Sequence, residues 1–161
     1  MTGETRYLLL LITGIILSAC RQSDSAPAFD KARVAEEVKT TLHNYYRDIK
    51  SNGILAEFKY LDSSDDFFWI PPGFSHPLTY DSVAFILKSN ASGFRSIDNT
   101  FDSLRIIPLS NNLATYYCIM HSVMMDTSGK KFSQAFIESG TLIKRKEGWK
   151  LLSGQTSILN Q

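Results

Sequence analysis

Two ionisable side chains occur inside apolar runs that favour β-strands. Glu138 follows Phe136 and Ile137, and His121 follows Met120. Desolvation raises the pKa of a carboxyl group that faces a protein interior, which suits proton transfer near neutral pH. The simpler interpretations, which we prefer, are a carboxylate on a solvated sheet face and a histidine packed in the core or at an interface. Glu138 and His121 are nevertheless the candidate catalytic residues.

The other reactive residue types show no spacing typical of a metal or nucleophilic site. The three histidines are scattered and no cysteine pair accompanies them, so we expect no zinc site. Asp62, Asp65 and Asp66 lack the alternation of a calcium-binding loop and are interpreted as turn formers. Cys118 lies in a strand-forming run, where a free cysteine is usually buried. We therefore expect neither a metal nor a cofactor.

Composition limits the classes of partner. The 161 residues include 17 basic and 16 acidic side chains, which gives a formal net charge of +1. Proteins that bind nucleic acid usually gather basic residues on one face, whereas the charges here are mixed along the chain. We expect no nucleic-acid partner and one domain of ordinary size.

The first half of the chain predicts helices. Apolar residues recur every three or four positions from Val34 to Ile49, which is typical of one helical face, with Asp30 as the N-cap and Gly53 as the end. A short second helix is expected through residues 55–61, a strand at residues 67–70 and a third helix at about residues 80–89. Pro71 and Pro72 end the strand, because proline lacks the N–H group that a ladder needs.

The second half predicts an antiparallel meander. From about Ile97 onward, apolar residues alternate with polar ones, and turn residues separate the runs. The expected strands are residues 101–109, 113–125, 131–145 and 149–158. Helices followed by hairpin-linked strands indicate the α+β class.

Residues 140–152 form an apolar and basic strand, a charged turn with Gly148, and then Trp149 and a final strand. This segment, together with Tyr60-Leu61-Asp62 before the short strand, resembles the nuclear transport factor 2-like superfamily, including its SnoaL-like and ketosteroid isomerase-like branches. The similarity extends over roughly residues 30–158. It implies a cone-shaped, curved antiparallel sheet wrapped around three N-terminal helices. The inward side chains of such a sheet line a conical cavity.

The resemblance also tests specific positions. In the isomerase branch a tyrosine of the first helix supplies an oxyanion hydrogen bond, and Tyr46 holds that position. An aspartate before a proline moves the proton there, but this chain has Ile70, which has no titratable group. Many members carry a histidine in the last strand, where this chain has Gln155. The resemblance therefore favours binding over catalysis.

Three residues are the expected ligand contacts. Tyr46, Trp69 and Gln155 would offer aromatic surface and polar groups to a small apolar ligand. Strict alternation along the last strand places Gln155 on the same face as Trp149 and Leu151. Apolar residues on both faces of residues 113–125 predict a homodimer through the sheet.

The start of the chain predicts where the protein is located. An apolar run over residues 7–17 leads into Leu17-Ser18-Ala19-Cys20, which resembles a bacterial lipobox. The resemblance implies a signal peptide at residues 1–19, lipid attachment at Cys20 and a flexible tether at residues 20–29, before a domain at residues 30–161. We expect a lipoprotein of the cell envelope, anchored to the outer membrane and facing the periplasm.

Three functions are compatible with these features. The preferred hypothesis is a lipid-anchored, non-catalytic domain that binds a small apolar ligand or a protein partner. The alternative is a SnoaL-like isomerase, dehydratase or cyclase that uses Glu138 or His121 on a hydrophobic substrate. The third is a structural dimerisation module.

Overall fold

The computed structural model describes residues 28–160. The expected signal peptide, the lipid-attachment residue Cys20 and most of the expected tether lie outside the described residues, and they stay predictions. Within residues 28–160, no helix is both long enough and apolar enough to cross a membrane.

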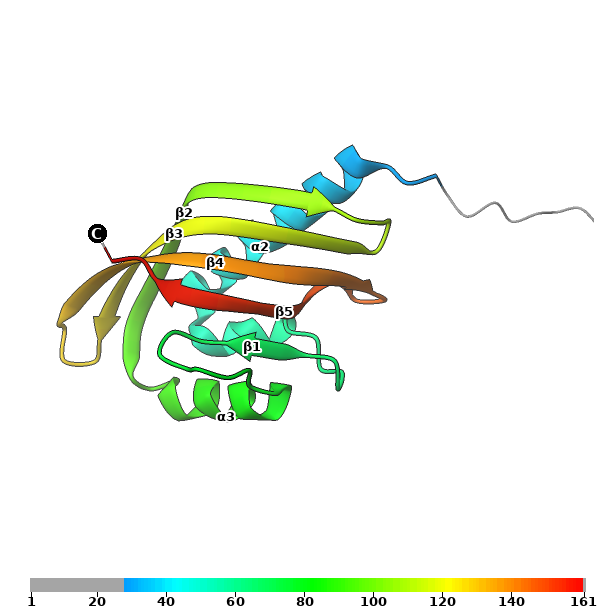
Figure 1. Cartoon of the computed structure of the whole chain (residues 1–161). Helices are drawn as coiled ribbons and strands as arrows, with labels where there is room; N and C mark the ends of the chain where they lie inside the picture. The colour runs from blue at the N-terminus through cyan, green and yellow to red at the C-terminus, as the bar shows by residue number, and fades with distance from the viewer. Residues whose placement is uncertain (1–27, 161) are drawn as a thin grey trace, which may run out of the picture.

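The long helix α2 spans Lys31–Asn52 and lies across one face of the sheet (Figure 1). The Asp30 side chain accepts a hydrogen bond from the Arg33 backbone N–H, as an N-cap does. Gly53 ends the helix with a φ of 80°, a left-handed value that glycine adopts without strain. Both predicted ends of this helix are confirmed.

Three short elements follow α2 along the chain, and one of them is an edge strand of the sheet. The expected second helix is a 3-10 helix, η2, at Ile54–Lys59, and the strand β1 covers Phe68–Ile70. Helix α3 spans Tyr80–Asn90, and the Thr79 hydroxyl accepts a hydrogen bond from the Ser82 backbone N–H. In Figure 1, α3 lies below β1 and away from the upper strands.

The remaining strands are long and form a curved sheet of order β1-β5-β4-β3-β2. Their bounds are β2 Phe94–Pro108, β3 Leu113–Asp126, β4 Lys131–Arg145 and β5 Gly148–Ile158. Neighbours among these four strands pair antiparallel, whereas β1 pairs with β5 in parallel. The α+β class with a curved sheet around helices is confirmed, and β1 makes the sheet mixed.

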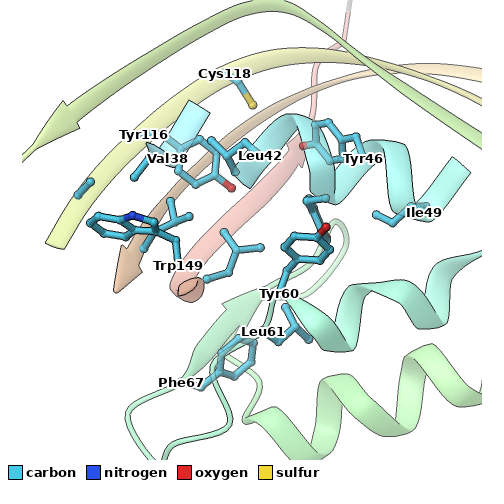
Figure 2. Packing of buried hydrophobic residues seen from close by; sticks show 14 of the residues in the cluster. Val38, Leu42, Tyr46, Ile49, Tyr60, Leu61, Phe67, Tyr116, Cys118 and Trp149 are labelled. Carbon is cyan, nitrogen blue, oxygen red and sulfur yellow. The ribbon is translucent and has the colours of Figure 1, made fainter. Parts of the chain in front are cut away.

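The core fills the space between α2 and the concave sheet face (Figure 2). Val34, Val38 and Leu42 on α2 are fully or almost fully buried, as the helical spacing predicted. Cys118 on β3 is a buried free cysteine, and burial raises the pKa of its thiol to about 12. Cys118 is therefore a core residue, as expected, and is not activated as a nucleophile.

A β-bulge divides β5 into two parts. Thr141 pairs with Ser153, but the next residue, Leu142, pairs with Leu151, so that Leu152 has no partner on β4. One extra residue reverses the alternation of faces along the rest of the strand. Trp149 and Leu151 are therefore buried on the concave face before the bulge, and Thr156 occupies that face after it.

The convex sheet face exposes apolar side chains. Tyr117 and Ile137, on β3 and β4, are each 43% exposed, and Ile107 on β2 is similar. This face is where the expected homodimer would form, and that dimer stays a prediction.

Candidate functional site

A cavity of about 240 Å³ lies between the helices and the concave sheet face. Apolar and aromatic side chains make up most of its wall, among them Ile49, Phe67, Trp69 and Leu87. The polar side chains in the wall are Tyr45, Tyr46, Glu57, Asn99, Glu138 and Thr156. A mainly apolar cavity with a few polar groups is the usual form of a small-molecule site, and this volume suits a small ligand.

Glu138 lies on the cavity wall and is 7% exposed. The preference for a solvated sheet face was therefore wrong. On β4, Glu138 pairs with Cys118 of β3 and Thr156 of β5, so all three share the concave face. The carboxyl group is in the protein interior because Glu138 is on the same face of β4 as Gly140 and Leu142, which are also buried.

Three hydroxyl groups donate hydrogen bonds to Glu138. Its Oε1 accepts from Tyr116 at 2.6 Å and from Tyr46 at 3.2 Å, and its Oε2 accepts from Thr156 at 2.8 Å. The Tyr46 hydroxyl also lies 2.9 Å from the Met120 sulfur. Burial raises the pKa of Glu138, and the three hydroxyl donors oppose that rise.

Trp69 is held in the wall by two glycines. Its indole N–H donates to the Thr156 hydroxyl at 3.1 Å, which extends the network from Glu138. A Cβ atom on Gly154 would lie 2.5 Å from the Trp69 ring, and one on Gly140 would lie 3.3 Å from it. Any larger residue at position 154 would displace the indole, so glycine there fixes the position of Trp69.

A second carboxyl group faces the same cavity. Glu57, on η2, is half-buried, and its Oε2 accepts a hydrogen bond of 2.9 Å from the Tyr45 hydroxyl. Desolvation raises the pKa of Glu57 to about 7, and the negative charge of Glu138 contributes in the same direction. The cavity thus holds two carboxyl groups with raised pKa values.

Comparison with solved structures identifies the fold of this chain. The sequence matches no protein-family profile and no curated protein. A nuclear transport factor 2-like superfamily protein from Salmonella enterica superposes with a TM-score of 0.68 at 16% identity, covering 81% of this chain and 94% of that one. The chain has the nuclear transport factor 2-like fold.

Other structures with this fold carry names that describe an activity. A candidate dehydratase of the NTF2-like family from Streptomyces avermitilis gives a TM-score of 0.67 at 14% identity, with 81% of this chain and 99% of that chain covered. A ketosteroid isomerase-like protein from Erwinia carotovora atroseptica gives 0.60 at 17% identity, with 79% and 97% covered. At these identities the likeness shows the fold alone.

The NTF2-like fold brings two of the three expected ligand contacts together. Tyr46 and Trp69 both line the cavity, joined through Glu138 and Thr156. Figure 2 shows Tyr46 on α2 among the buried side chains between the helix and the sheet. Gln155 is exposed and lies on the opposite sheet face, contrary to expectation, because the bulge at Leu152 reverses the alternation.

Two other expected positions lie outside the cavity. Ile70, at the isomerase aspartate position, pairs with Gln155 and lines a shallow hollow on the convex face. His121 is half-buried, and its Nε2 lies 2.6 Å from the Ser133 hydroxyl, away from the cavity. Of the two candidate catalytic residues, Glu138 is thus the one that faces the site.

Several site residues had no signal in the sequence. Thr156 faces the cavity because of a bulge that the residue pattern does not predict. Glu57 faces the cavity because η2 turns back toward α2. The hydrogen bond from Tyr116 to Glu138 joins two neighbouring strands at positions that no local pattern connects. Tyr45 and Glu57 are twelve residues apart, on either side of a helix end. Helical periodicity therefore does not predict the contact between them.

Proposed function

We propose that this domain binds a small, mainly apolar molecule in the cavity and orients it through a hydrogen bond to the Glu138 region. The observation that carries the proposal is an apolar cavity of about 240 Å³ with its polar groups gathered at Glu138 and Glu57. Apolar walls provide affinity, and a few fixed polar groups provide orientation. With the predicted lipid on Cys20, such a domain would hold its ligand at a membrane surface.

A titration with 2-phenylethanol, followed by ¹H–¹⁵N NMR, tests this function. We expect shifts confined to residues that line the cavity. Val83 lines the cavity from α3, so Val83→Phe should fill the space and abolish the shifts. Ser89→Phe places the same side chain on the exposed side of α3 and should leave them intact. Binding that survives Val83→Phe, or shifts spread over the convex face, would contradict the proposal.

Acid–base catalysis is the second candidate function. It is supported by the 3.2 Å contact between Glu138 and Tyr46, because a carboxyl group with a raised pKa beside a phenol can move a proton. The names of the Streptomyces and Erwinia proteins are consistent with such chemistry. Proton abstraction next to a carbonyl can be tested by deuterium uptake into cyclohexanone in D₂O. Uptake that is catalysed by the protein and lost in Glu138→Gln would support the enzyme, whereas uptake at the uncatalysed rate would exclude this step.

A further inference from the structure

The hydroxyl and indole donors in and next to the cavity wall are already in use. The hydroxyl groups of Tyr45, Tyr116 and Thr156 each donate to a glutamate oxygen. The Trp69 N–H donates to Thr156, and the Tyr46 hydroxyl lies between Glu138 and Met120. A ligand therefore finds few hydroxyl or indole donors left to bind it.

The acceptors of the wall are in surplus. Glu57 and Glu138 each carry two oxygens with more lone pairs than the protein donors occupy. The Oδ1 atom of Asn99, on β2, is buried and accepts no hydrogen bond from any described residue. Apart from the Asn99 amide N–H₂, the hydrogen-bonding capacity left in the wall is for accepting, which favours a ligand that donates hydrogen bonds.

Among residues 28–160, no lysine, arginine or histidine forms an ion pair with either carboxyl group. The residues that line the cavity include no lysine, arginine or histidine. Other acidic residues of the described chain have such partners, for example Asp48 with Lys59 at 2.8 Å and Asp62 with Arg145 at 2.6 Å. A buried carboxylate without a counter-ion is costly, and a bound cation would lower that cost.

Several aromatic rings line the same cavity. The rings of Tyr45 and Tyr46 lie 5.0 Å apart, and Trp69 and Phe67 face the same cavity. The faces of aromatic rings attract organic cations, most strongly where water is excluded. A bare metal ion fits less well, because no three acidic, histidine or cysteine side chains of residues 28–160 are grouped to hold one.

From this surplus of acceptors, the lack of a cation in the wall and the aromatic rings, we infer that the ligand is an apolar primary or secondary amine, bound as its ammonium ion between Glu57 and Glu138. The inference rests on the proposed function and names the ligand class of the same cavity. The ammonium group would donate to the carboxylates, and its apolar body would contact Phe67, Trp69 and Leu87.

Three probes of matched shape test the inference by calorimetry and NMR with the wild-type protein. They are 2-phenylethylamine, 2-phenylethanol and phenylacetate. We expect the amine to bind about tenfold or more tightly than the alcohol, and the carboxylate to bind more weakly than both. Alcohol or carboxylate binding that equals the amine's would overturn the inference alone. Failure of all three probes to bind would overturn the proposed function and the inference with it.

The pH dependence gives a second readout. The titratable groups that line the same cavity as Glu57 are Tyr45 and Tyr46 from α2 and Glu138 from β4. Because the pKa of Glu57 is about 7 and an alkylammonium ion stays protonated to about pH 10, amine affinity should rise between pH 6 and 8 while alcohol affinity does not. Glu57→Gln should flatten that rise. Amine affinity that is independent of pH in the wild type would contradict the role of Glu57.

Discussion

Two regions beside α2 contain buried or half-buried glutamates. Cationic side chains surround the carboxyl group in one region, and only uncharged donors contact the carboxyl groups in the other. Glu37 of α2 is contacted by Lys144 at 2.6 Å, Arg33 at 2.7 Å and the Trp149 indole N–H at 2.9 Å. At the cavity, Glu57 and Glu138 receive only hydroxyl donors.

The pKa values follow that difference. Hydrogen bonds from Lys144 and Trp149 lower the pKa of Glu37 to about 2, whereas desolvation raises that of Glu57 to about 7. The Glu37 region satisfies its own charge and joins α2 to β4 and β5. Among the described residues, the cavity wall has no cationic side chain to balance the charge of Glu57 and Glu138. Carboxyl groups without such a partner are expected of a binding site rather than of a structural contact.

Removing the Glu138 side chain should have the largest effect on folding. Glu138→Ala leaves the hydroxyls of Tyr116 and Thr156 without their acceptor in the interior and leaves the Tyr46 hydroxyl with the Met120 sulfur alone, so we expect a loss of about 3 kcal/mol in the free energy of unfolding. Glu138→Gln keeps an acceptor oxygen and should stay within about 1 kcal/mol of the wild type. Urea unfolding at pH 7 measures both, and equal losses would show that the hydroxyl network has no stabilising role.

Glu57 should give an intermediate effect that depends on pH. Its folded-state pKa of about 7 lies above the ordinary value of 4.5, so the folded protein holds this proton more tightly than the unfolded chain. Stability should therefore fall as pH rises from about 4.5 through 7, by about 2 kcal/mol after allowance for partial exposure.

The matched variant is Glu57→Gln, in which that contribution to the pH dependence should vanish. Thermal unfolding at several pH values between 5 and 8 provides the comparison. Parallel curves for the variant and the wild type would mean that Glu57 ionises normally.

Glu37 should give the smallest effect, with the opposite sign. Its folded-state pKa is lowered, so its stabilisation is complete above about pH 4.5 and is lost as pH falls toward 2. Glu37→Gln should cost about 1 kcal/mol at pH 7, because the ion pair is partly exposed, and progressively less in acid. Glu36→Gln, at an exposed position of the same helix, is the control and should change little. A cost that persists unchanged at pH 3 would contradict the ionic explanation.

The fold was more predictable than the site, for reasons that particular residues show. The spacing of Val34, Val38 and Leu42 marks one buried face of α2, and Asp30 and Gly53 mark its ends, because these signals are local. Turn residues such as Gly129 and Gly148 likewise separate the strands, and both have positive φ.

The site depends on tertiary features that leave no local pattern. Tyr46 and Trp69 were expected at the cavity through the family resemblance, and both line it. Gln155 was misplaced because alternation cannot anticipate a bulge at Leu152. Glu138 was assigned to solvent because sequence alone does not show which face of β4 is covered.

Each of the two glutamate regions contains one of the chain's two tryptophans. The Trp69 indole N–H is linked through Thr156 to Glu138, and the Trp149 indole N–H donates directly to Glu37. The protein therefore carries an intrinsic fluorophore at each region. In a Trp149→Phe variant, all indole emission would come from the cavity wall, so ligand entry could be followed optically without any attached dye.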